Sequence, residues 1–125
     1  MNVAVGIGCR KNCPAGVIET LVRQALNRVP YAAPLGLFTL VDKQGEAGIA
    51  EAAGLMGLEL TYLAREALRA RAEDVQTYSP SAESLFGVPS VAEAAALAGA
   101  GPASVLIVPR IAAGGATCAI AGAAP

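Results

Sequence analysis

Apolar and small residues alternate at the beginning of the chain, and the pattern predicts a strand followed by a tight loop. Val3, Val5 and Ile7 occupy every second position, which is typical of a strand that borders a core. Gly6 and Gly8 stand between or just after them, and a residue without a Cβ permits backbone conformations and close approaches that other residues forbid. The opening of the chain therefore predicts a buried strand that turns sharply.

Helical and extended patterns alternate along the rest of the chain. Strands are predicted at 3–7, 35–41, 58–63, 105–108 and 117–120. Helices are predicted at 14–28, 44–56, 64–72 and from 90 to about 98. Gly114 and Gly115 suit a hairpin between the last two strands. This order favours an α/β three-layer sandwich, a mixed sheet of about five strands with helices on both faces, in a single domain spanning 1–125.

Several side chains carry expectations about how the helices end and pack. The first helix is expected to bury Ile18, Leu21 and Val22. Asp42 is expected to cap the second helix, because its carboxylate can accept hydrogen bonds from the first free backbone amides. The third helix is expected to turn Leu68 inward and Arg65, Arg69 and Arg71 outward. Residues 75–89 are turn-rich and predict a loop that holds one helical turn.

Composition excludes several classes of function. The charge is nearly balanced, with 9 basic and 10 acidic side chains, so no electrostatic footprint for DNA or RNA is present. No apolar run approaches the roughly 20 residues that cross a bilayer, and the start lacks the pattern of a signal peptide, so the cytoplasm is the expected location. The chain has no histidine, which removes Ser-His-Asp and Cys-His catalysis. Three cysteines without histidine predict neither a familiar zinc site nor a disulfide framework.

The loop after the first strand is a candidate anion site. Arg10 and Lys11 stand beside the free backbone amides expected at the start of the next helix, where Pro14 fits the first turn. The alternative is a structural turn whose two cations are solvated. Cys9 has two interpretations as well: a reactive thiol beside cations, or a small apolar residue that fills the turn, which we favour.

The chain resembles the CobE proteins of cobalamin biosynthesis, which are similar to the C-terminal domain of the larger CbiG proteins. The resemblance is carried by residues 6–11, by Lys43 with Glu46 and Gly48, by residues 87–97, and by residues 117–121. Two features depart from the family pattern. Asn12 and Cys13 stand where a glycine-rich turn would continue, and Arg110 lies near the position where a lysine commonly precedes the last strand.

The resemblance implies a role in handling a precorrin or corrinoid intermediate, whose carboxylates surround a large apolar macrocycle. The candidate ligand-binding residues are Gly6, Gly8, Cys9, Arg10, Lys11, Lys43, Glu46 and Arg110. Lys43 and Glu46 are also the candidate catalytic pair of an alternative, a hydrolase that opens the lactone of a precorrin-5-type intermediate. A third alternative is an interaction domain that docks onto another enzyme of the pathway. No metal and no cofactor is expected.

Four further residues have stronger structural than functional interpretations. Ser90 and Glu93 match a capping box at a helix start, which favours a capping role for Glu93 over catalysis. Ser79 and Ser81 flank a proline, and residues in such turns usually serve the backbone rather than a ligand.

Overall fold

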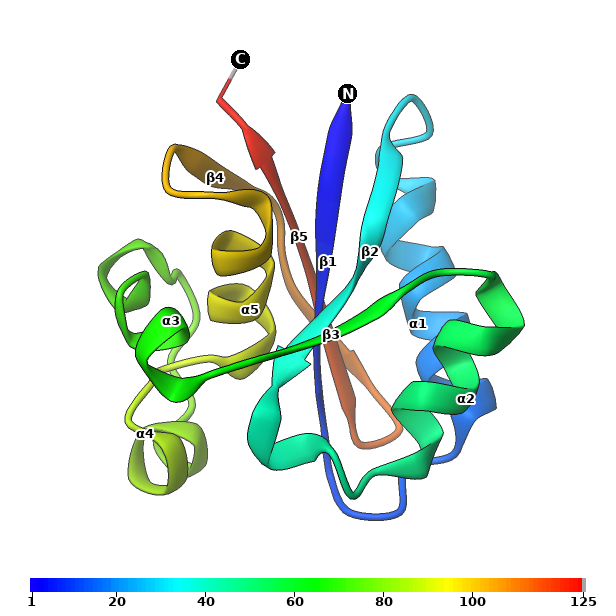
Figure 1. The fold of residues 1–125 in the computed structure, drawn as a ribbon, viewed down its shortest axis with the longest axis horizontal. Helices are drawn as coiled ribbons and strands as arrows, with labels where there is room; N and C mark the ends of the chain where they lie inside the picture. The colour runs from blue at the N-terminus through cyan, green and yellow to red at the C-terminus, as the bar shows by residue number, and fades with distance from the viewer. Residues whose placement is uncertain (125) are drawn as a thin grey trace.

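A mixed five-stranded sheet forms the centre of the structure, a computed structural model that describes residues 1–124 (Figure 1). Its strands are β1 (Asn2–Cys9), β2 (Ala33–Leu40), β3 (Leu60–Leu63), β4 (Ser104–Ala113) and β5 (Ala116–Ala123). They lie in the order β3-β2-β1-β5-β4, with β1, β2 and β3 parallel and β5 antiparallel to both β1 and β4. The carboxyl ends of β1 to β4 therefore meet at one edge of the sheet, together with the β4–β5 hairpin.

Helices cover both faces of this sheet, as the sequence pattern predicts. They are α1 (Ala15–Asn27), α2 (Ala47–Met56), α3 (Arg65–Arg69), α4 (Pro80–Phe86) and α5 (Val91–Ala100). Figure 1 shows α1 and α2 on one side of the sheet and α5, flanked by α3 and α4, on the other. Short 3-10 turns follow β2 and α3, at Val41–Lys43 and Ala72–Asp74. None of the helices in residues 1–124 is long and apolar enough to span a bilayer.

The alternation in β1 decides what each face packs against. Val3, Val5 and Ile7 join the main core beneath α1 and α2, which also contains the predicted Ile18, Leu21 and Val22. Gly6 faces the other way and lies under α5, where a Cβ would overlap the carbonyl oxygen of Ala92. Small residues on this face of the sheet therefore let the alanine-rich α5 lie close to it.

The boundaries of several predicted elements differ from those observed, and for two of them the structure shows the cause. The helix expected at 44–56 begins only at Ala47, because the chain first makes the 3-10 turn after β2. Asp42 lies in that turn and does not cap α2; its carboxylate forms an ion pair with Arg65 instead. The second strand begins at Ala33 rather than at 35, because the amide of Ala33 bonds to the carbonyl oxygen of Met1 and extends the pairing with β1.

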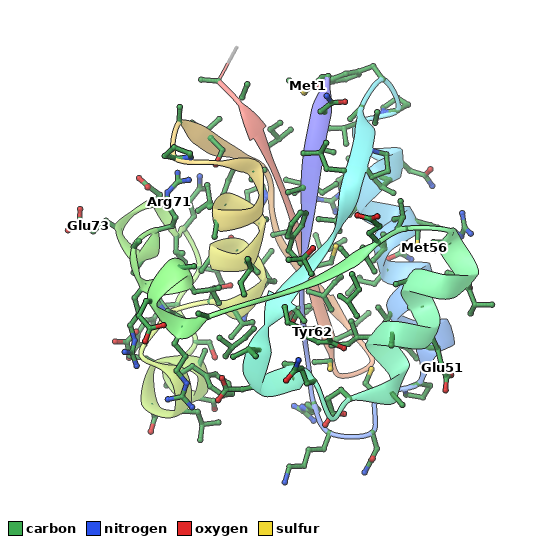
Figure 2. The ribbon with its side chains drawn as sticks, viewed as in Figure 1. Met1, Glu51, Met56, Tyr62, Arg71 and Glu73 are labelled. Atoms are coloured by element: carbon green, nitrogen blue, oxygen red, sulfur yellow. The ribbon has the colours of Figure 1, made fainter. Side chains whose placement is uncertain are left out.

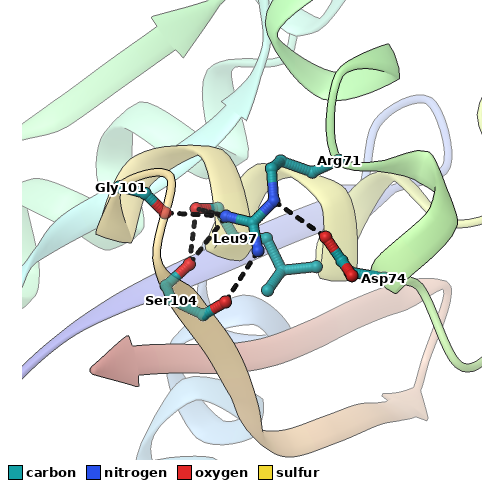
Figure 3. Close-up of polar contacts among 5 residues, drawn as sticks. All are labelled: Arg71, Asp74, Leu97, Gly101 and Ser104. Atoms are coloured by element: carbon teal, nitrogen blue, oxygen red, sulfur yellow. Dashed lines mark hydrogen bonds and ion pairs between the residues drawn. The ribbon is translucent and has the colours of Figure 1, made fainter. Parts of the chain in front are cut away.

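The expectation that Arg71 points outward is wrong, and its actual place explains how α5 is fixed. Its side chain is only 11% exposed and donates to the carbonyl oxygens of Leu97, Gly101 and Ser104 and to the hydroxyl of Ser104 (Figure 3). Asp74 completes the cluster with an ion pair. The helix expected at 64–72 ends at Arg69, and the turn that follows directs Arg71 toward the end of α5 (Figure 2).

Candidate functional site

A cleft of about 880 Å³ lies at the edge of the sheet where β1, β2 and β4 end. Loops after these strands, the β4–β5 hairpin, α4 and the start of α5 form its walls. Its volume lies in the upper part of the range typical of small-molecule sites. Open α/β sheets bind ligands at the carboxyl ends of their strands, so both position and size indicate a ligand site.

The cleft is lined by four cationic side chains and two acidic ones. The cations are Arg10, Lys11, Lys43 and Arg110, all of them predicted site residues. The two acids are engaged within the protein. Asp42 pairs with Arg65, whose hydrogen bond lowers the pKa of that carboxyl. Glu46 accepts a hydrogen bond from the backbone amide of Asn12. Within residues 1–124, none of Arg10, Lys11 and Arg110 forms an ion pair. The side chains that line the cleft therefore carry more positive than negative charge.

Lys43 and Glu46 hold the loop at 9–13, which we call the cleft loop. The Nζ of Lys43 donates to the carbonyl oxygen of Cys9 at 2.9 Å, and Glu46 Oε1 accepts from the amide of Asn12 at 2.7 Å. Asn12 adopts a left-handed backbone conformation with φ of 61°. Lys43 and Glu46, the candidate catalytic pair, form no ion pair with each other among the described residues, because each side chain reaches the cleft loop instead.

The cleft loop is also attached to the β4–β5 hairpin and to α2. The amide of Arg10 donates to the carbonyl oxygen of Gly115 at 2.8 Å. The thiol of Cys13 lies 3.7 Å from the carbonyl oxygen of Gly114. Gly48, in the first turn of α2, is close enough to Cys13 that a Cβ would overlap its carbonyl oxygen. These contacts fix the backbone that carries the first two cations of the cleft.

The start of α1, whose free amides are part of the predicted anion site, does not line the cleft. Among the residues of the cleft loop and the beginning of α1, the cleft lining ends at Lys11. Gly16 and Val17 instead line a second pocket of about 320 Å³, which borders the cleft at Ala113 and Gly114 of the hairpin. Asn12 and Cys13, which stand between Lys11 and the start of α1, line neither the cleft nor this second pocket.

The two predicted glycines have different roles. Gly6 is covered by α5 and does not line the cleft, so its absent side chain serves packing. Gly8 does line the cleft, and a Cβ there would lie 2.6 Å from Thr117 Oγ1. Gly8 therefore makes room for a hydroxyl of the protein itself.

Cys9 lines the cleft, but its surroundings do not activate the thiol. Burial raises the pKa of Cys9 to about 11, and the nearby charge of Lys43 offsets only part of this effect. The thiol is therefore protonated at neutral pH, whereas a nucleophilic cysteine needs the thiolate. This agrees with the interpretation of Cys9 as a small residue that fills the turn.

Sequence reasoning missed an apolar wall of the cleft, formed by Ala82, Leu85 and Phe86 of α4. The ring centroid of Phe86 lies 5.2 Å from Lys43 Nζ and 5.7 Å from the guanidinium carbon of Arg65. Such contacts between a cation and an aromatic ring attach α4 to the turn after β2 and to the start of α3. Because α4 is short and sits in a turn-rich segment, its sequence gave only a weak helical signal.

Glu93 is part of a capping arrangement, but only half of the expected box forms. Its amide donates to Ser90 Oγ at 3.3 Å, as the motif predicts. The carboxylate, however, does not return to Ser90; it bonds to Gln76, Thr77 and Arg110. Among residues 1–124, no group of three or more Cys, Asp or Glu side chains is placed to hold a metal ion.

The fold and the cleft together define a class of protein: an α/β sandwich with a cation-lined site at the strand ends. The chain belongs to the family described as Cobalamin synthesis G C-terminus, which matches residues 3–121. It is 33% identical to Protein CobE of Sinorhizobium sp. over 122 residues, which cover 96% of this chain and 79% of that protein. The resemblance found in the sequence motifs is thereby confirmed.

Solved structures agree with this assignment. The crystal structure of CobE, a protein from the cobalamin (vitamin B12) biosynthetic pathway, superposes with a TM-score of 0.86 at 29% identity, covering 95% of this chain and 88% of that one. The cobalamin biosynthesis protein chiG from Agrobacterium tumefaciens strain C58 gives a TM-score of 0.76 at 37% identity, covering 98% and 99%. The chain is therefore a protein of the cobalamin biosynthesis pathway with the predicted α/β fold.

Proposed function

We propose that this protein binds a carboxylate-bearing precorrin or corrinoid intermediate in the cleft and handles it without changing it. The observation that carries this proposal is the excess of positive charge in the cleft. Arg10, Lys11 and Arg110 have no acidic partner within residues 1–124, whereas Asp42 and Glu46 are occupied. Charged hydrogen bonds from such side chains recognise carboxylates strongly.

The shape and the apolar wall of the cleft support the same ligand class. Intermediates of the corrin pathway combine a large apolar macrocycle with acetate and propionate side chains. Leu85 is 63% exposed on α4, which gives the macrocycle an apolar surface opposite the cations. A site with apolar walls and a few directed polar groups is the usual design for a ligand of this kind.

The contacts of the candidate catalytic residues favour handling over hydrolysis. Lys43 and Glu46 each bind the backbone of the cleft loop, so both act on its conformation. Burial keeps the Cys9 thiol protonated. A hydrolase would need a group in reach of the substrate that moves a proton near neutral pH, and these three residues are otherwise engaged.

A titration with two related corrins tests the proposal. Cobyrinic acid carries free carboxylates, whereas most of them are amides in cobyric acid. We expect the visible spectrum of cobyrinic acid to shift with saturable binding, and cobyric acid to bind at least about tenfold more weakly. Arg110→Gln should weaken cobyrinic acid binding by about 1–3 kcal/mol. Arg28→Gln is the matched control, because Arg28 is an exposed arginine that follows α1 at the opposite edge of the sheet.

Two results would contradict the proposal. Equal affinity for the acid and the amide would show that the cations do not recognise carboxylates. Release of acetaldehyde from a lactone-bearing precorrin, abolished by Lys43→Ala or Glu46→Ala, would instead establish the hydrolase.

A further inference from the structure

Glu93 holds a fully buried carboxylate whose hydrogen bonds all go to other segments of the chain. Oε1 accepts from the backbone amides of Gln76 and Thr77, at 2.9 and 2.8 Å. Oε2 accepts from the hydroxyl of Thr77 and from the amide of Arg110, both at 2.9 Å. Burial of a carboxylate is costly unless its oxygens are satisfied, and these four donors satisfy it.

One of the four donors belongs to an irregular stretch of β4. Val108 pairs with Ile120 and Ile111 with Cys118, so two residues of β4 oppose one residue of β5 between these pairs. This is the count of a β-bulge, and bulges beside sites redirect side chains. The backbone amide of Arg110 donates to the carboxylate of Glu93, and the side chain of Arg110 lines the cleft.

The other three donors belong to residues 75–79, which we call the strap. The strap leads from the turn after α3 into α4, and its last residue donates to the carbonyl oxygen of Pro89 at 2.7 Å. Ser79, the last residue of the strap, and the apolar wall of α4 that follows it both line the cleft. Glu93 therefore joins the bulge that carries Arg110 to the segment that carries the apolar wall, without lining the cleft itself.

We propose that Glu93 is a positioning residue that sets Arg110 and the α4 wall against the same ligand. This inference rests on the proposed binding function. A carboxylate is suited to this place because both of its oxygens only accept, and all four neighbours donate. A glutamine would turn its NH₂ group toward either Arg110 or the strap, so one of the two connections would break.

A double-mutant cycle with cobyrinic acid as the probe tests this role. We expect Glu93→Gln to weaken binding about tenfold in the wild-type background and much less in an Arg110→Gln background. A purely structural role would lower the affinity by the same factor in both backgrounds. Additive losses in a variant whose Arg110 amide exchanges faster would overturn the proposal, as would an unchanged affinity in Glu93→Gln.

Amide hydrogen exchange of the free protein separates this inference from the binding proposal. In Glu93→Gln, the amides of Arg110 or of Gln76 and Thr77 should exchange faster, while those of β1 stay protected. If cobyrinic acid fails to bind the wild-type protein, the binding function is wrong, and the exchange result alone decides whether Glu93 fixes these segments. If Glu93→Gln does not fold, Thr77→Val, which removes the hydroxyl donor of the strap, should raise the exchange of the Gln76 and Thr77 amides; no change would overturn the role.

Discussion

The Nζ of Lys43 lies 2.9 Å from the carbonyl oxygen of Cys9, so the turn after β2 holds the loop after β1. The same Nζ lies 5.2 Å from the ring centroid of Phe86. Lys43 thus connects the cleft loop to the apolar wall of α4. It brings together two sides of the cleft, at Cys9 and at Phe86, that are more than seventy residues apart in sequence.

Replacing Lys43 with Met keeps the aliphatic part of the side chain but removes the charge. We expect the free energy of unfolding to fall by about 1–3 kcal/mol, because a charged hydrogen bond and a contact with an aromatic ring are lost. Chemical denaturation measures this change. Glu51→Gln, on the exposed outer side of α2, is the control and should change it by less than about 0.5 kcal/mol. Equal effects in both variants would show that Lys43 is merely a surface residue.

The core beneath α1 provides a test of the fold. Leu21 is 2% exposed and packs against the sheet, so Leu21→Ala should lower the free energy of unfolding by about 2–5 kcal/mol through lost burial and a cavity. Leu55→Ala is the matched variant on α2, where the side chain is 63% exposed, and it should change stability little. A small effect at Leu21 would mean that the wrong face of α1 is buried.

Arg71 should be sensitive even to a conservative change. Its planar guanidinium bonds to three carbonyl oxygens and a hydroxyl at the junction of α5 and β4, a geometry that lysine does not reproduce (Figure 3). Arg71→Lys should therefore lower the free energy of unfolding by about 2–4 kcal/mol. Asp74→Asn removes only a 58% exposed partner and should have an effect below about 1 kcal/mol. Thermal and chemical unfolding measure both variants. A loss of stability in Arg71→Lys no larger than that in Asp74→Asn would contradict this role of Arg71.

Cys9 should react slowly with alkylating agents although its side chain borders the cleft. Its pKa of about 11 lies above the ordinary value, so only about one thiol in a thousand is ionised at pH 8. Alkylation by iodoacetamide, followed by mass spectrometry of the peptide, should accelerate as the pH rises toward 11. Rapid modification of Cys9 at pH 7 in the folded protein would contradict the assignment of a protonated, structural thiol.

Most of the fold follows from patterns that sequence alone contains. The alternation of Val3, Val5 and Ile7 predicted β1, and the apolar face of the first helix predicted which residues α1 buries. Helix and strand ends were less predictable, because they depend on partners elsewhere in the chain. Asp42 has the chemistry of a cap, but Arg65 lies within reach and takes its carboxylate.

The site was predictable in its cations and less so in its geometry. Arg10, Lys11, Lys43 and Arg110 were named from sequence, and the parallel strands bring them to one cleft. The hydrogen-bond partners of the Lys43 and Glu93 side chains were not predictable, because each side chain bonds to a segment that is distant in sequence. The capping-box spacing predicts a local partner, Ser90, for the carboxylate of Glu93, whereas the fold provides Gln76, Thr77 and Arg110.

The location of bound cobyrinic acid tests the central claim most directly. Backbone amide chemical shifts of the labelled protein, recorded by NMR during a titration, report which residues meet the ligand. We predict that the shifts concentrate around the cleft, at residues 8–11, 79–86 and 110–117. The amides at the opposite edge of the sheet, in residues 28–32 and 101–104, should not shift. Shifts concentrated at that opposite edge or on the outer side of α1 and α2, with residues 8–11 and 110–117 unaffected, would contradict it.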